Sequence, residues 1–201
     1  MPRIQRAIVS CHDKTGLVDF ARFLREQHVE LVSTSGTLGV LREAGIEASS
    51  IEEFTGVPEL MNGRVKSLHP KIHAGLLGIR DSKLHVEQMQ AHDLQWVDLV
   101  VVNPRPLDEV IARPGGAAEE VFELADIGGI AMIRSAAKNF RYVTVAVKPE
   151  RYPAVMHEML AHEGEVSFAT RYRLAQEAFY CTADYDRAIA DYLRKTEPPV
   201  E

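Results

Sequence analysis

The chain has 201 residues, of which 46% are hydrophobic and 26% are charged, and its formal net charge is −6. These values are typical of one globular domain with a core large enough to fold without disulfides. The acidic balance argues against a nucleic-acid partner, although a local basic pocket for a small anion is compatible with it. No stretch is apolar over a bilayer's width and no signal peptide is evident, so we expect no membrane partner and a cytoplasmic location.

Short apolar runs alternate along the chain with amphipathic segments. Strands are predicted at residues 7–9, 30–33, 75–77, 97–102 and 142–147, and helices at 17–24, 38–45, 129–140, 150–162 and 168–194. This alternation predicts an α/β fold with three layers, a mainly parallel sheet flanked by helices. We expect one domain over residues 1–195 with a loop at 113–116, followed by a disordered tail at 196–201.

Polar loops follow three of the predicted strands. Residues 10–16 follow the first strand, 33–37 follow the second, and 103–106 follow the strand at 97–102. In open parallel sheets, ligands bind outside the carboxyl ends of the strands. The sequence therefore predicts a ligand site where these three loops meet, with Lys14 facing the same edge.

The segment Ser33-Thr34-Ser35-Gly36-Thr37 is a candidate phosphate cradle. It joins a predicted strand to a predicted helix, and four of its five residues carry hydroxyls. Free amides at a helix N-terminus bind phosphate well. Capping of the helix by one Ser or Thr, with no ligand, is the alternative. The spacing is not that of a P-loop, because the Walker lysine is absent.

The segment Gly63–His73 carries several basic side chains just before an apolar run. Arg64 offers a planar fork for phosphate or carbonyl oxygens, and Lys66 offers a compact charge for a reacting atom. A basic surface loop before a buried strand is an equally good reading of this segment alone.

No metal site is predicted. His69 and His73 lie four apart, but Pro70 is expected to interrupt a helix there, and no third ligand is near. The two cysteines, Cys11 and Cys181, are far apart and predict neither a disulfide framework nor a zinc site.

Asp126 precedes a Gly-Gly pair and a predicted helix that carries Lys138. Asp126 is a candidate N-cap as well as a candidate acid. Lys138 lies about 15 Å further along a regular helix. Both side chains can serve one site only if the helix starts late or bends, or if the ligand lies along it.

These segments together resemble the inosine monophosphate (IMP) cyclohydrolase domain, the amino-terminal half of the bifunctional purine biosynthesis protein. The similar segments run in family order to about Leu193: Asp13–Leu17, Ser33–Thr37, Thr55–Glu59, Gly63–His73, Asp98–Asn103, Asp126–Gly129 with Met132–Asn139, and Ala178–Phe179 with Thr182–Asp186. The resemblance implies a fold similar to methylglyoxal synthase. It also implies ring closure of formylated aminoimidazole carboxamide ribotide (FAICAR) to IMP, with loss of water.

The same resemblance implies no metal and no organic cofactor. It implies a homodimer, and because the transformylase half is absent from the chain, a separate transformylase is considered as a partner. By position, Lys66 and Lys138 correspond to reaction-centre lysines, with Asp126 as the acidic partner. The nucleotide contacts fall on His12, Asp13, Lys14, Thr34, Ser35, Gly36, Thr37, Arg64, Val65, Ser67, Val102, Asn103 and Ile127.

The chain also departs from the family pattern. Arg105 stands where the family has a reaction-centre tyrosine, and His12 stands where serine is usual. Arginine can stabilise an oxyanion but does not give up a proton. Two alternatives stay open. One is a lyase that resembles methylglyoxal synthase and acts on a triose phosphate, against which Gly63–His73 and Asp126–Asn139 argue. The other is a non-catalytic purine-nucleotide-binding domain, which Arg105 keeps open.

Overall fold

The computed structural model describes residues 3–107, 111 and 118–196. At its centre is a five-stranded sheet with the strand order β3-β2-β1-β4-β5. The strands are β1 (Arg6–Cys11), β2 (Glu30–Ser33), β3 (Ser49–Ser50), β4 (Leu99–Asn103) and β5 (Thr144–Ala146), and all neighbouring pairs are parallel. The predicted α/β fold with a parallel sheet is confirmed.

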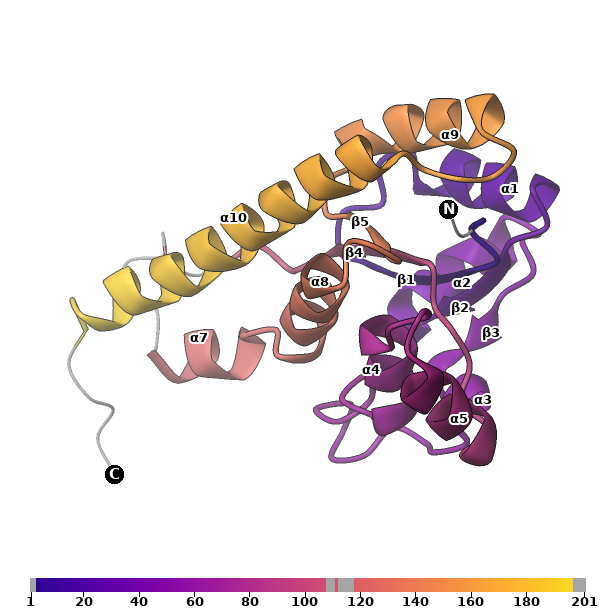
Figure 1. Cartoon of the computed structure of the whole chain (residues 1–201). Helices are drawn as coiled ribbons and strands as arrows, with labels where there is room; N and C mark the ends of the chain where they lie inside the picture. Colours follow the sequence, from indigo (N-terminus) through magenta and orange to yellow (C-terminus); the bar gives the residue numbers. More distant parts are fainter. Residues whose placement is uncertain (1–2, 108–110, 112–117, 197–201) are drawn as a thin grey trace.

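Helices cover both faces of the sheet and complete the three predicted layers (Figure 1). Helices α1 (Leu17–Glu26), α2 (Ser35–Glu43) and α9 (Tyr152–Ala161) share one hydrophobic cluster with the first face. Helices α3 (Ile51–Thr55), α4 (Pro70–Leu77) and α8 (Gly128–Lys138) pack on the other. The strands alternate accordingly, because Val101 points into the first cluster and Val100 into the second.

The long helix α10 (Phe168–Leu193) confirms the predicted final helix. Its first half packs on α8 and β5, and its second half extends beyond the sheet (Figure 1). There it forms a small third cluster with α7 (Ala118–Leu124), in which Val121 meets Tyr185 and Ile189. This contact matters for function, because α7 leads into the segment around Asp126.

The predicted strand at residues 75–77 is wrong, since these residues end helix α4. Pro70 is in the first turn of α4, where a missing N–H costs nothing. His69 is the N-cap, and its Nδ1 accepts a hydrogen bond from the Lys71 amide at 3.2 Å. Pro70 therefore begins a helix and does not interrupt one. Gly75 is needed in it, because a Cβ there would overlap the Gln95 carbonyl oxygen.

Four short elements were not predicted from the sequence: β3, α3, α7 and α5 (Lys83–Ala91). None of the helices in the described ranges has the length and hydropathy that a membrane span requires. Residues 197–201 of the expected tail and the expected loop at 113–116 lie outside the described residues.

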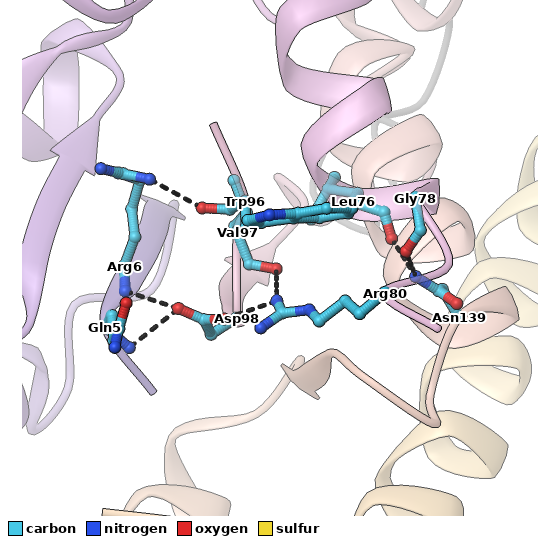
Figure 2. Close-up of polar contacts among 9 residues, drawn as sticks. All are labelled: Gln5, Arg6, Leu76, Gly78, Arg80, Trp96, Val97, Asp98 and Asn139. Carbon is cyan, nitrogen blue, oxygen red and sulfur yellow. Dashed lines mark hydrogen bonds and ion pairs between the residues drawn. The ribbon is translucent and has the colours of Figure 1, made fainter. Parts of the chain in front are cut away.

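Asp98 fixes the amino ends of the two central strands, as Figure 2 shows. Its carboxylate is buried and accepts hydrogen bonds from the backbone amides of Gln5 and Arg6, both at 2.8 Å. Its other oxygen pairs with Arg80 at 2.5 Å. The Arg80 guanidinium also lies over the Trp96 ring. One side chain thus joins the start of β1, the start of β4 and the segment after α4.

We predict that Asp98→Ala destabilises the protein by about 3–5 kcal/mol, because it leaves the partly buried Arg80 guanidinium and two amides without their acceptor. Chemical denaturation measures this free energy of unfolding. Asp19→Ala is the matched control, since Asp19 pairs with Arg22 on the exposed surface of α1 and such pairs contribute about 0–1 kcal/mol. Equal losses in the two variants would contradict the role given to Asp98.

Candidate active site

A cleft of about 860 Å³ lies at the carboxyl ends of β1, β2 and β4, where the sequence predicted a ligand site. Five segments line it: the loop after β1, the start of α2, residues 62–68, the loop after β4, and residues 122–129. The predicted residues that line it are His12, Lys14, Thr34, Gly36, Thr37, Arg64, Lys66, Ser67, Asn103, Arg105, Asp126 and Ile127.

The start of α2 is open to an anion. Thr34 occupies the N-cap position, but its side chain makes no capping hydrogen bond. Its hydroxyl instead bonds the Ser10 hydroxyl at 2.8 Å, and the Thr37 hydroxyl bonds the backbone of Cys11. The hydroxyls thus hold the two strand ends together, and the positive end of the helix dipole faces the cleft. This arrangement disfavours the simple capping reading.

Asn103 joins the loop after β4 to the loop after β1. Its carbonyl oxygen accepts from the His12 amide at 3.2 Å, its side-chain oxygen accepts from the Asp13 amide at 2.7 Å, and its side-chain nitrogen donates to the Asp13 carbonyl at 3.1 Å. The Asp13 carboxylate accepts from the Thr15 amide, which is the main cause that lowers the pKa of Asp13. Asp13 therefore shapes the loop and does not line the cleft.

A tight turn presents the basic residues of the segment 63–73. Leu60 and Val65 exchange two backbone hydrogen bonds, at 2.9 and 3.2 Å, around a turn in which Gly63 has φ of 85°. Val65 therefore contributes backbone to the turn, and the residues on either side of it, Arg64 and Lys66, line the cleft.

Two polar side chains at this edge of the sheet are already bound by carboxylates of the chain. Arg64 pairs with Glu123 of α7, and the Ser35 hydroxyl donates to Glu59. Ser35 and Glu59 line a neighbouring cavity of about 430 Å³, outside the main cleft. Lys66 and Arg105, in contrast, make no hydrogen bond or ion pair with the residues that the structure describes. We call these two side chains, which have no bonding partner among the described residues, the uncommitted cations of the cleft.

Asp126 and Lys138 lie at opposite ends of α8. The Asp126 carboxylate accepts from the Gly129 amide at 2.7 Å, and the Asp126 amide donates to the Tyr185 hydroxyl at 2.9 Å. Lys138 is exposed in the last turn, about 15 Å from the start of the helix by the α-helical rise, and does not line the cleft. The structure therefore does not bring these two predicted catalytic residues together within one chain.

Among the other predicted contacts, Val102 is buried in the core and does not reach the cleft. Sequence reasoning missed Ser10, Phe122 and Glu123, which do line it. Ser10 is the first residue of the predicted polar loop at 10–16. Phe122 and Glu123 belong to a short helix with no recognisable site pattern.

Cys11, at the end of β1, is suited to packing and not to nucleophilic attack. Burial raises the pKa of its thiol to about 11, and its sulfur lies 3.7 Å from the Tyr152 hydroxyl. In the described part of the chain, no group of three or more His, Cys, Asp or Glu side chains is arranged to hold a metal ion.

Comparison with known families now places the chain. Residues 16–131 match the model of the MGS-like domain. The chain belongs to the MGS-like domain family. Residues 136–201 match a second model, that of the AICARFT/IMPCHase bienzyme. The predicted resemblance and the predicted methylglyoxal-synthase-like fold are thereby confirmed.

Curated relatives and a solved structure extend this result. The "Bifunctional purine biosynthesis protein PurH" of Chlorobium luteolum is 50% identical over 98% of this chain and 37% of its own length. The protein of the same name from Neisseria meningitidis serogroup A is 46% identical over 96% of this chain and 36% of its own. The chain thus spans little more than a third of these relatives. A structure titled "Crystal structure of ForH" superposes with a TM-score of 0.84 at 30% identity, covering 94% of this chain and 99% of that one.

The close approach of two cleft segments gives a testable prediction. A Cβ at Gly128 would overlap the Ser67 hydroxyl oxygen, so Gly128→Ala must move that hydroxyl out of its place between the two segments. We expect the dissociation constant for IMP, measured by calorimetry, to rise about tenfold, equivalent to about 1.4 kcal/mol. Gly39→Ala is the control, because a Cβ at Gly39 meets nothing within 4 Å. Unchanged IMP affinity in the Gly128 variant would contradict a contribution of the Ser67 hydroxyl to nucleotide binding.

Proposed function

We propose that the chain catalyses the ring closure of FAICAR to IMP, with loss of water, as an enzyme of purine biosynthesis. The observation that carries the proposal is the convergence of an open helix N-terminus with two uncommitted cations, Lys66 and Arg105, in one cleft. The names of the relatives, which are purine biosynthesis proteins at 46% to 51% identity, support the same pathway.

The phosphate of the nucleotide binds at the start of α2 in this proposal. The backbone around Gly36 supplies amide donors, and the helix dipole favours a dianion there. Lys14 adds a positive charge from the neighbouring loop, where its ammonium bonds the Cys11 and His12 carbonyls. The ribose and the imidazole ring then extend along the cleft towards Lys66 and Asp126.

The reaction itself needs a stabilised oxygen. The carboxamide nitrogen attacks the formyl carbon, and negative charge develops on the formyl oxygen. Lys66 and Arg105 supply the compensating charge, and neither has to break an existing contact to do so. Asp126 is the carboxylate in the cleft that can accept a proton from the attacking nitrogen.

Holding the substrate in a folded conformation contributes the rest of the rate. Attacking nitrogen and formyl carbon belong to one molecule, and well-oriented intramolecular reactions reach effective molarities of about 10⁵–10⁸ M. The loops after β1 and β4, which the hydrogen bonds of Asn103 join, provide the surface against which the substrate folds. The catalytic role of Lys138, the homodimer and the separate transformylase stay predictions.

A non-catalytic nucleotide-binding domain is the second candidate, and Arg105 is the observation that favours it. Arginine holds an anion but does not exchange protons at neutral pH. Under this reading the cleft binds IMP, and the cations serve affinity alone.

Turnover decides between the two candidates. Purified protein is incubated with FAICAR, and IMP is followed by absorbance. We expect conversion by the wild type and a loss of about 10²–10³ in kcat for Lys66→Ala, because one donor to the developing oxyanion is removed. Lys83→Ala, on the exposed start of α5, is the matched control and should retain full activity.

Lys138→Ala belongs in the same experiment. Because Lys138 lies outside the cleft, full activity of this variant is expected if a single chain forms the whole reaction centre. Wild-type protein that binds IMP but produces none from FAICAR would contradict the enzyme proposal and support the nucleotide-binding domain.

A further inference from the structure

We propose that His12 is the proton donor of the cyclisation, and that it protonates the formyl oxygen held by Arg105 and Lys66. This inference rests on the proposed function and names a group that the reaction needs and that Arg105 does not supply.

The position of His12 follows from the pairing of the central strands. Cys11 of β1 lies opposite Asn103 of β4, so the residues that follow them stand at adjacent strand ends. The His12 amide donates to the Asn103 carbonyl at 3.2 Å, and Asn103 holds Asp13 by two further hydrogen bonds. The backbone of His12 is therefore fixed beside the loop that carries Arg105, and both residues line the cleft.

The other ionisable side chains that line the cleft are poor proton donors at neutral pH. Four of them are cations of high basicity: Lys14, Arg64, Lys66 and Arg105. Burial raises the pKa of the Cys11 thiol to about 11. The Glu123 carboxylate pairs with Arg64, and the Asp126 carboxylate accepts a hydrogen bond from the Gly129 amide, so both act as acceptors in this structure.

Histidine is the side-chain type that both gives and takes protons between pH 5 and 8. His12 is the histidine that lines the cleft in the described part of the chain. It is exposed, and its imidazole makes no hydrogen bond with the residues that the structure describes. The ring is thus free to turn towards a bound substrate.

Charged side chains of both signs neighbour His12. Asp13 and Lys14 belong to its own loop, and Arg105 belongs to the loop after β4. Lys66, the Arg64–Glu123 pair and Asp126 line the same cleft. The same proximity acts on Asp13, whose pKa is lowered first by its bonds to Thr15 and further by the charges of His12 and Lys14.

The proton transfers balance over two steps. In the first, the carboxamide nitrogen bonds to the formyl carbon, the π pair of the C=O bond moves to oxygen, and that oxygen takes a proton from His12. The attacking nitrogen releases a proton to Asp126. In the second, the C–OH bond breaks, the hydroxyl leaves as water with the proton from Asp126, and the former formamide nitrogen returns its proton to His12.

The test is the pH dependence of kcat for wild type and His12→Gln, with His157→Gln on the exposed face of α9 as control. A donor must be protonated, so wild-type kcat should fall as pH rises through the titration of the histidine. We expect His12→Gln to lower kcat about 10²-fold or more and to lose this limb of the profile, with IMP affinity changed less than threefold. The His157 variant should match the wild type.

A second variant separates proton transfer from structure. His12→Gly leaves space for free imidazole, which should restore part of kcat in proportion to its protonated concentration. Wild-type kcat and an unchanged pH profile in His12→Gln would overturn the proposal. So would a loss of kcat that accompanies loss of IMP binding and is not restored by imidazole. If the wild type binds IMP yet never converts FAICAR, the proposed function fails, and this inference fails with it.

Discussion

The parallel pairing of β1 with β4 is the constraint on which the rest of this molecule depends. A different side chain secures each end of this pairing. Asp98 lies at the amino end and Asn103 at the carboxyl end. Asp98 accepts from the Arg6 amide of β1 and pairs with the partly buried Arg80. Asn103 binds the loop that carries His12 and Lys14. These bonds hold the starts of the two loops side by side at the edge of the cleft.

The cleft built on these loops concentrates positive charge in an acidic protein. The start of α2 and Lys14 form one positive region, and Lys66 with Arg105 forms another. Such a separation suits a substrate with a phosphate at one end and a developing oxyanion at the other. Arg64, a third cation of the cleft, is paired with Glu123 of α7.

The sequence predicted the elements whose patterns are strong and missed those that depend on tertiary contacts. Buried β-branched runs such as 97–102 predict strands well. The three apolar residues at 75–77 fit a helix as well as a strand, and they end helix α4, which has Pro70 in its first turn. The three predicted loops at strand ends supply 9 of the 23 residues that line the cleft, and residues 62–68 and 122–129 supply the rest. Glu123 was not predictable, because α7 reaches the cleft only by packing on α10. Helical rise alone correctly separated Lys138 from Asp126.

The central claim is that a nucleotide lies in this cleft with its phosphate at the start of α2. A crystal structure of the chain with bound IMP tests it most directly. We predict phosphate oxygens within hydrogen-bond distance of the Gly36 amide, and the purine ring between Lys66 and Asp126. A phosphate bound elsewhere, with the cleft empty, would contradict it.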